Sequence, residues 1–211
     1  PQTLQTHLAA IEKASEECLA NGITSFHDAG SDSLAIAAFL QQAEAGALKT
    51  RLYVMLSSRD TTLLQAWYQR GPAIGLGNET LTIRSIKMYV DGALGSRGAW
   101  LLAPYEDRPN HFGMATQPIP YVLQVAREGL QNGFQVCSHA IGDRANREVL
   151  DQYEIAFKEF PEKAKDHRFR IEHAQHLTDQ DIPRFAQMGV IPAMQAIHMS
   201  SDRPWAIFRL G

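Results

Sequence analysis

Apolar positions along the chain follow two alternating spacings, one typical of helices and one typical of strands. In residues 4–19 the apolar side chains recur every three or four positions, which predicts a helix, and the Asn-Gly pair at 21–22 marks its end. A short apolar run at residues 23–27 predicts a strand, and residues 28–30 predict the turn that follows it. The chain is therefore expected to begin with a helix and then a strand.

The same alternation continues through the rest of the chain. Further helices are predicted at residues 34–47, 61–70, 120–132, 145–160 and 179–188, and further strands at residues 51–56, 83–90, 134–139, 169–173 and 190–195. Such alternation requires parallel strands joined by crossover helices, either in a doubly wound sheet or in an eight-stranded barrel. The glycine-rich loops typical of nucleotide-binding sheets are missing from the sequence. The pattern therefore favours an α/β fold that forms part of a (β/α)8 TIM-type barrel.

Composition excludes several classes of protein. The 211 residues are 45% hydrophobic with a formal net charge of −3, which is typical of a globular domain and offers no basic surface for nucleic acid. No apolar run approaches the roughly 18 to 20 residues needed to cross a membrane, and residues 1–10 do not resemble a signal peptide. Cys18 and Cys137 are too few for a disulfide framework, so both are expected to be reduced in the cytoplasm.

One long segment between predicted elements, residues 92–117, has the character of a functional loop. It contains glycine and proline but also Trp100, Tyr105 and Phe112, which is unusual for a simple linker. We expect this loop to shape a substrate pocket.

Four polar residues follow or end the apolar stretches, and in a barrel that is where catalytic groups lie. They are His27, Lys87, His139 and His173. Imidazole nitrogens suit zinc, whereas a lysine ammonium repels cations and could take part only as a neutral amine or as a carbamate formed with CO2. Each residue alone is commonly structural. Their joint placement on successive strands instead favours one shared metal site.

Four longer segments carry a resemblance to a known family. They are residues 86–97 (IKMYVDGALGSR), 138–145 (SHAIGDRA), 171–175 (IEHAQ) and 194–206 (MQAIHMSSDRPWA). Together they resemble the amidohydrolase superfamily, and most closely its family 3 branch, the group that includes N-substituted formamide deformylase. The motifs occur in the expected order over almost the whole chain.

The resemblance implies that residues 1–211 are part of a TIM-barrel domain, with strands two to seven present. Lys87 would be the carboxylated lysine of strand four that bridges two metals, and His139 and His173 would be the ligands of strands five and six. The His-x-His pair of strand one, the acid-base Asp of strand eight and any accessory β domain lie outside this chain. The chain is thus expected to be the centre of a longer protein and to be inactive alone.

The resemblance also implies a reaction, in which metal-activated water hydrolyses an amide-type or formamide-type C–N bond of a small molecule. One or two divalent ions, with zinc favoured, would be the cofactor. The candidates for substrate contact are His27, Asp91, Arg97 and His198, although Asp91 and Arg97 could equally hold the loop through a salt bridge or a turn. No nucleic acid or membrane partner is expected, whereas unpaired strand edges would favour a homo-oligomer.

Two alternatives from other classes remain open. In a barrel lyase or aldolase, Lys87 would form a Schiff base while His139 and His173 move protons, and borohydride would trap substrate on the lysine. In a non-catalytic α/β binding module, the histidines would be satisfied by the backbone and no metal would be retained. Bound zinc would favour the hydrolase.

Overall fold

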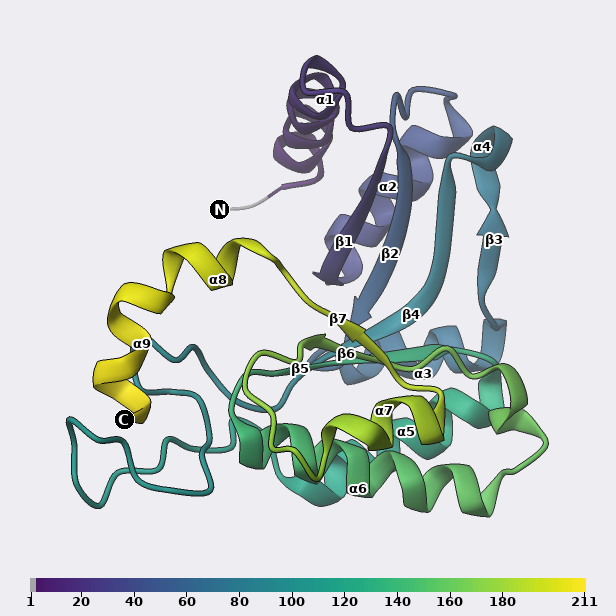
Figure 1. Cartoon of the computed structure of the whole chain (residues 1–211). Coiled ribbons are helices and arrows are strands. Elements are labelled where there is room, and N and C mark those ends of the chain that lie inside the picture. The colour runs from purple at the N-terminus through teal and green to yellow at the C-terminus, as the bar shows by residue number, and fades with distance from the viewer. Residues whose placement is uncertain (1–2) are drawn as a thin grey trace. The chain divides into compact units, whose positions relative to one another are not determined.

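The computed structural model describes residues 3–211 and divides into two compact units (Figure 1). The first unit contains residues 3–87 and 132–134, and the second contains residues 88–131 and 135–211. Within the described residues, no helix is both long enough and apolar enough to span a membrane.

The first unit alternates helices and strands. Its elements are α1 (Leu4–Ala20), β1 (Ser25–Ser31), α2 (Ser33–Glu44), β2 (Arg51–Ser57), α3 (Thr61–Arg70), β3 (Ala73–Gly75), α4 (Leu76–Glu79) and most of β4 (Leu81–Tyr89). Strands β1, β2 and β4 pair in parallel, and β3 pairs antiparallel with β4. Asp32 and Asp60 cap α2 and α3 through their carboxylates, which accept backbone N–H groups of the first helical turn. These caps explain why both helices begin immediately after an aspartate.

The second unit continues the alternation. Its elements are α5 (Ile119–Asn132), β5 (Gln135–Ala140), α6 (Asp143–Glu159), the 3-10 turn Lys163–Asp166, β6 (Arg170–His173), α7 (Ile182–Met188), β7 (Ile191–Ala193), α8 (Ile197–Ser201) and α9 (Arg203–Leu210). Strands β5, β6 and β7 are parallel, with His139 opposite Glu172 and Ala140 opposite His173. Figure 1 shows α5, α6 and α7 along one side of these strands. The register therefore brings the ends of β5 and β6 to the same edge.

Strand order follows the chain, β1-β2-β4-β5-β6-β7, with β3 outside this path. The last two residues of β4 belong to the second unit, where the N–H of Val90 donates to the carbonyl of His139 (3.0 Å). Parallel strands alternating with helices confirm the predicted α/β class. All the helices and strands predicted from apolar spacing are present, although several of their bounds differ.

The largest correction concerns β1. Residues 28–30, predicted as a turn, continue the strand, since Ala29 pairs with Met55 and Ser31 with Leu56. His27 is therefore the third residue of a seven-residue strand and not its end. The turn is displaced because Asp32, which caps α2, is the residue at which the backbone leaves the strand.

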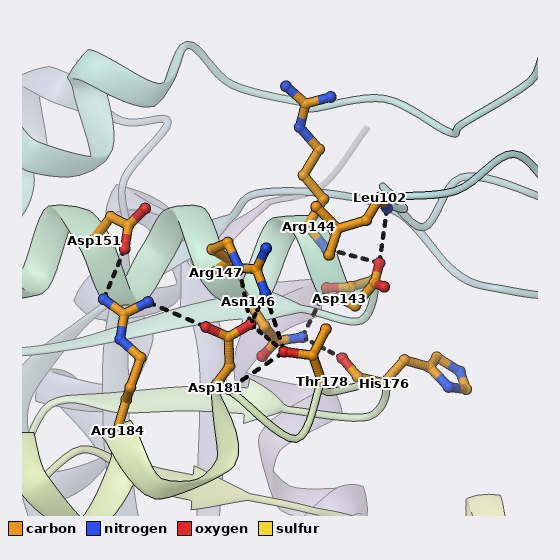
Figure 2. Close-up of polar contacts among 11 residues, drawn as sticks. Leu102, Asp143, Arg144, Asn146, Arg147, Asp151, His176, Thr178, Asp181 and Arg184 are labelled. Carbon is orange, nitrogen blue, oxygen red and sulfur yellow. Dashed lines mark hydrogen bonds and ion pairs between the residues drawn. The ribbon is translucent and has the colours of Figure 1, made fainter.

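An ion-pair network joins α6 to the segment that begins α7 (Figure 2). The buried carboxylate of Asp181 accepts from Arg147 (3.0 Å), Thr178 (2.7 Å) and Arg184 (3.2 Å). Burial by itself would raise the pKa of Asp181, but these hydrogen bonds together lower it. Asp181 is thus held as a carboxylate, and α7 begins at Ile182, three residues later than the predicted start of 179.

Candidate active site

Two predicted ligands, His139 and His173, lie side by side in the second unit. They stand on neighbouring strands, at the fifth of the six residues of β5 and at the last residue of β6. Their ring centroids are 4.6 Å apart and the rings are nearly perpendicular, at 76°. Because the ends of parallel strands meet at one edge, this neighbourhood follows directly from the register.

The backbone at the end of β6 is strained. His173 has φ 75° and Ala174 has φ 41°, both in the left-handed region that residues with a Cβ rarely adopt. Such strain costs free energy and is concentrated at functional sites, where surrounding contacts hold it in place. Here it turns the chain away directly after the imidazole of His173.

Gln195 supports the ring of His173. The Oε1 atom of Gln195 lies 2.6 Å from Nδ1 of His173, and the amide nitrogen of Gln195 donates to the carbonyl of Ala193 (3.0 Å). Since an amide oxygen can only accept, Nδ1 of His173 carries the proton and Nε2 is the acceptor nitrogen of the ring. A support of this kind is common behind metal-binding histidines.

His139 carries an unusual buried nitrogen. Its Nε2 atom has no hydrogen-bond partner among residues 3–211, although the carboxylate of Asp91 lies 3.4 Å away. A buried polar atom without a partner is costly and calls for a cause such as an ion. The two imidazoles have the donor chemistry that divalent zinc prefers, so these residues fit a metal. Within residues 3–211, however, no group of three or more His, Cys, Asp or Glu side chains could hold one, so the pair is an incomplete ligand set.

Asp91 has a structural role that accounts for both of its oxygens. This buried carboxylate accepts the backbone N–H groups of Trp100 (2.9 Å), Ile141 (2.9 Å) and Gly142 (2.8 Å). Gly142 lies so close to the loop that an added Cβ would stand 2.0 Å from the carbonyl oxygen of Trp100. Asp91 therefore fastens the long loop to the turn after β5, which is the loop-holding alternative for this residue.

Arg97 is also engaged within the loop. Its guanidinium forms two hydrogen bonds with Asp107 (2.8 and 3.0 Å), and Asp107 also pairs with Arg209 of α9. A small core forms beneath, made by Leu94, Ala99, Leu101, Tyr105 and Ile141 and covered by Trp205 and Ala206 of α9. Burial raises the pKa of Tyr105 to about 12. The loop predicted to shape a pocket is thus a folded segment docked on α9.

His198 belongs to a polar chain beside His173. Its Nδ1 atom lies 3.1 Å from Oδ2 of Asp202, which also accepts from the amide of Gln175 (2.8 Å). Partial burial by itself would raise the pKa of Asp202, but hydrogen bonds from Ser201 and Gln175 help to lower it. The ring of His198 is 6.0 Å from that of His173.

These polar side chains line a cavity of about 600 Å³. It is lined by His173, Gln175, His176, Met194, Gln195, Ala196, His198, Met199, Asp202, Arg203 and Ala206. Sequence reasoning missed the roles of Gln175, Gln195 and Asp202, which depend on contacts across 22 to 27 positions of the chain. The four-residue spacing of His198 and Asp202 is a sequence signal that could have indicated their pairing.

His176, another lining residue, was also missed. Its Nε2 atom is buried without a hydrogen-bond partner in the described chain, and burial lowers its pKa. Figure 2 shows its backbone carbonyl accepting from the side chain of Asn146 (3.3 Å), which also holds the carbonyls of Ala140 and Gly142. Asn146 thus links the end of β5 and the turn after it to the segment that follows β6.

The remaining predicted residues, Lys87 and His27, lie in the first unit. Lys87 is buried near the end of β4, where its carbonyl accepts from the N–H of Ser58 (3.0 Å). His27 is exposed and stacks on Tyr53, with ring centroids 5.0 Å apart. The shared site of Lys87 with His139 and His173 stays a prediction.

The sequence of this chain is similar to that of known proteins. A model of the amidohydrolase family matches residues 1–211. The putative amidohydrolase YtcJ of Bacillus subtilis is 30% identical over 211 residues, which cover 96% of this chain and 37% of YtcJ. The LONG AFTER FAR-RED 3 protein of Arabidopsis thaliana is 29% identical, over 96% of this chain and 36% of its own length.

Two solved structures match the whole chain. Uncharacterized metal-dependent hydrolases from Pyrococcus furiosus and Pyrococcus horikoshii superpose with TM-scores of 0.88 and 0.86, at 29% and 26% identity. The match covers 100% of this chain and 42% and 41% of those chains, so this chain spans about two fifths of its relatives. The predicted fold class, an incomplete (β/α)8 barrel, is confirmed.

Proposed function

We propose, from the premise that this chain belongs to the amidohydrolase family, that the longer protein containing it is a metal-dependent hydrolase of C–N bonds. Membership confirms the resemblance seen in the sequence motifs. The observation that carries the proposal is the pair His139 and His173, 4.6 Å apart at adjacent strand ends, with a buried nitrogen that has no hydrogen-bond partner in the described chain. The similarity to the two metal-dependent hydrolases of Pyrococcus supports the same proposal.

In this proposal His139, His173 and a carboxylated Lys87 hold one or two divalent ions, with zinc as the proposed metal. A bound ion would polarise the scissile carbonyl and lower the pKa of water. Gln195 keeps the proton of His173 on Nδ1, so Nε2 is the nitrogen offered for coordination. The wall that binds substrate includes His198 and the folded loop that carries Arg97, and His27 stays a candidate for substrate contact.

The proposed substrate is a small amide or formamide, and the proposed compartment is the cytoplasm. The sequence contains two cysteines, Cys18 and Cys137, which are too few for the disulfide framework of a small secreted domain. Association of copies through strand edges stays part of the proposal, as does inactivity of this segment alone.

The test uses the full-length protein, with metal content measured by elemental analysis and hydrolysis assayed on a panel of N-formyl and N-acyl compounds. We expect His139→Ala and His173→Ala to lose metal and turnover together. His7→Ala is the matched control and should keep both, since His7 lies on α1 of the first unit, where its Nδ1 atom is 3.1 Å from the carbonyl oxygen of Thr3. Unchanged metal content in both site variants would contradict the proposal, and borohydride trapping of substrate on Lys87 would favour the Schiff-base alternative.

A further inference from the structure

We propose that His198, positioned by Asp202, selects substrates that present a hydrogen-bond donor beside the scissile carbonyl. This inference rests on the proposed hydrolase function and adds a specificity determinant to it. The amide N–H would donate to Nε2 of His198 while the carbonyl oxygen lies on the His173 side of the cavity, where a bound metal would polarise it.

Asp202 decides which nitrogen of the His198 ring carries a proton. A carboxylate oxygen accepts only, so the contact of 3.1 Å with Oδ2 of Asp202 places a proton on Nδ1. In the ring with a single proton, Nε2 then carries the lone pair. No hydrogen bond to Nε2 occurs among residues 3–211, and the side chain is 32% exposed on the wall of the 600 Å³ cavity. The nitrogen is therefore available as an acceptor.

The carboxylate of Asp202 is held on both of its oxygens. Gln175 donates to Oδ2 and Ser201 donates to Oδ1, each at 2.8 Å, so the carboxylate cannot rotate freely. Gln175 follows His173 by two residues, and the support of His198 thus comes from the same strand end as the proposed ligand. Asp202 is a positioning residue, because it acts on the substrate only through His198.

The rings of His173 and His198 are close enough for a single amide group to contact both, because their centroids are 6.0 Å apart. In a trans amide the carbonyl oxygen and the N–H point to opposite sides of the C–N bond. The carbonyl end can therefore lie toward His173 while the N–H end donates to His198, which a tertiary amide, lacking the N–H, cannot do.

The test compares N-butylformamide with N-butyl-N-methylformamide on the full-length enzyme. We expect the wild type to prefer the secondary amide by about tenfold or more in kcat/KM, the range for one lost hydrogen bond to a positioned group. In His198→Ala the preference should fall below about threefold, because no acceptor remains. A preference that survives in His198→Ala would overturn the inference.

Two variants separate positioning from folding. Asp202→Asn keeps an oxygen that accepts from His198 and Gln175, so selectivity should persist, whereas Asp202→Leu should lose it. Nitrogen NMR of 15N-histidine-labelled protein should show His198 protonated on Nδ1 in the wild type and in Asp202→Asn, but not in Asp202→Leu. A proton on Nε2 in the wild type would overturn the inference even with activity intact. Absence of hydrolysis of both amides would instead overturn the proposed function and this inference together.

Discussion

Replacing Asp91 with alanine should release the long loop from the turn after β5. The variant leaves three backbone N–H groups without their carboxylate, those of Trp100, Ile141 and Gly142. A hydrogen bond to a charged group contributes about 1.5 to 3 kcal/mol, and bonds that share one carboxylate are not additive. We therefore expect a loss of roughly 3 to 5 kcal/mol in local stability, or about two to four orders of magnitude in the equilibrium constant for opening.

Hydrogen exchange followed by mass spectrometry measures this loss where it occurs. Peptides covering residues 97–104 and 138–146 should exchange faster by that factor, because local opening exposes their amides. Asp91→Asn should be intermediate, since one oxygen remains while its amide nitrogen faces the N–H of Ile141. Glu162→Ala is the control, because this exposed carboxylate pairs with Lys165 and accepts none of the three N–H groups. Unchanged protection in Asp91→Ala would refute the reasoning.

Three further outcomes are expected. The pKa of Asp181 is lowered below its usual 3.8, so the stability that its carboxylate contributes is present above that pH and is lost as the pH falls through the pKa of the folded state. Urea unfolding at several pH values should therefore show a weaker pH dependence of the unfolding free energy in Asp181→Asn. Burial lowers the pKa of His167 below 6.5, and its Nδ1 accepts from the N–H of Phe169 (2.8 Å). As the pH drops below 6.5 the unfolded state therefore binds a proton before the folded state does, and the free energy of unfolding should fall in the wild type but not in His167→Phe. Lys87→Ala should abolish turnover of the full-length enzyme, with partial rescue by short carboxylic acids, and near-normal turnover without rescue would remove Lys87 from the site.

Apolar spacing predicted most elements of this fold because each longer helix and strand buries apolar side chains that recur at the period of that element. The helix predicted at residues 61–70 coincides with α3, which buries Leu63, Leu64 and Trp67 and is capped by Asp60. The short β3 was not predicted, since a three-residue strand carries no periodic signal and depends on the single antiparallel pair of Ala73 with Ile83. The extension of β1 through polar residues was missed for a related reason, because partners on β2 stabilise it.

Part of the candidate site was predictable from the same pattern. His139 and His173 end apolar strands, and adjacent parallel strands must bring such ends together. The supports were harder to predict, because Gln195 reaches His173 across 22 positions and Gln175 reaches Asp202 across 27, whereas only the i, i+4 pair of His198 and Asp202 is local. Local sequence thus identifies groups that share a strand edge, whereas the residues that set their protonation depend on loops folded in three dimensions.

The docking of the long loop on α9 has a consequence for recombining this protein with its relatives. Asp107 binds Arg97 of the loop and Arg209 of α9, while Trp205 packs over Gly95. A chimera that exchanges the loop alone would separate these partners and leave an uncompensated charge. Crossover points should therefore transfer the two segments as one cassette, and specificity among homologues is expected to diverge in both segments at once.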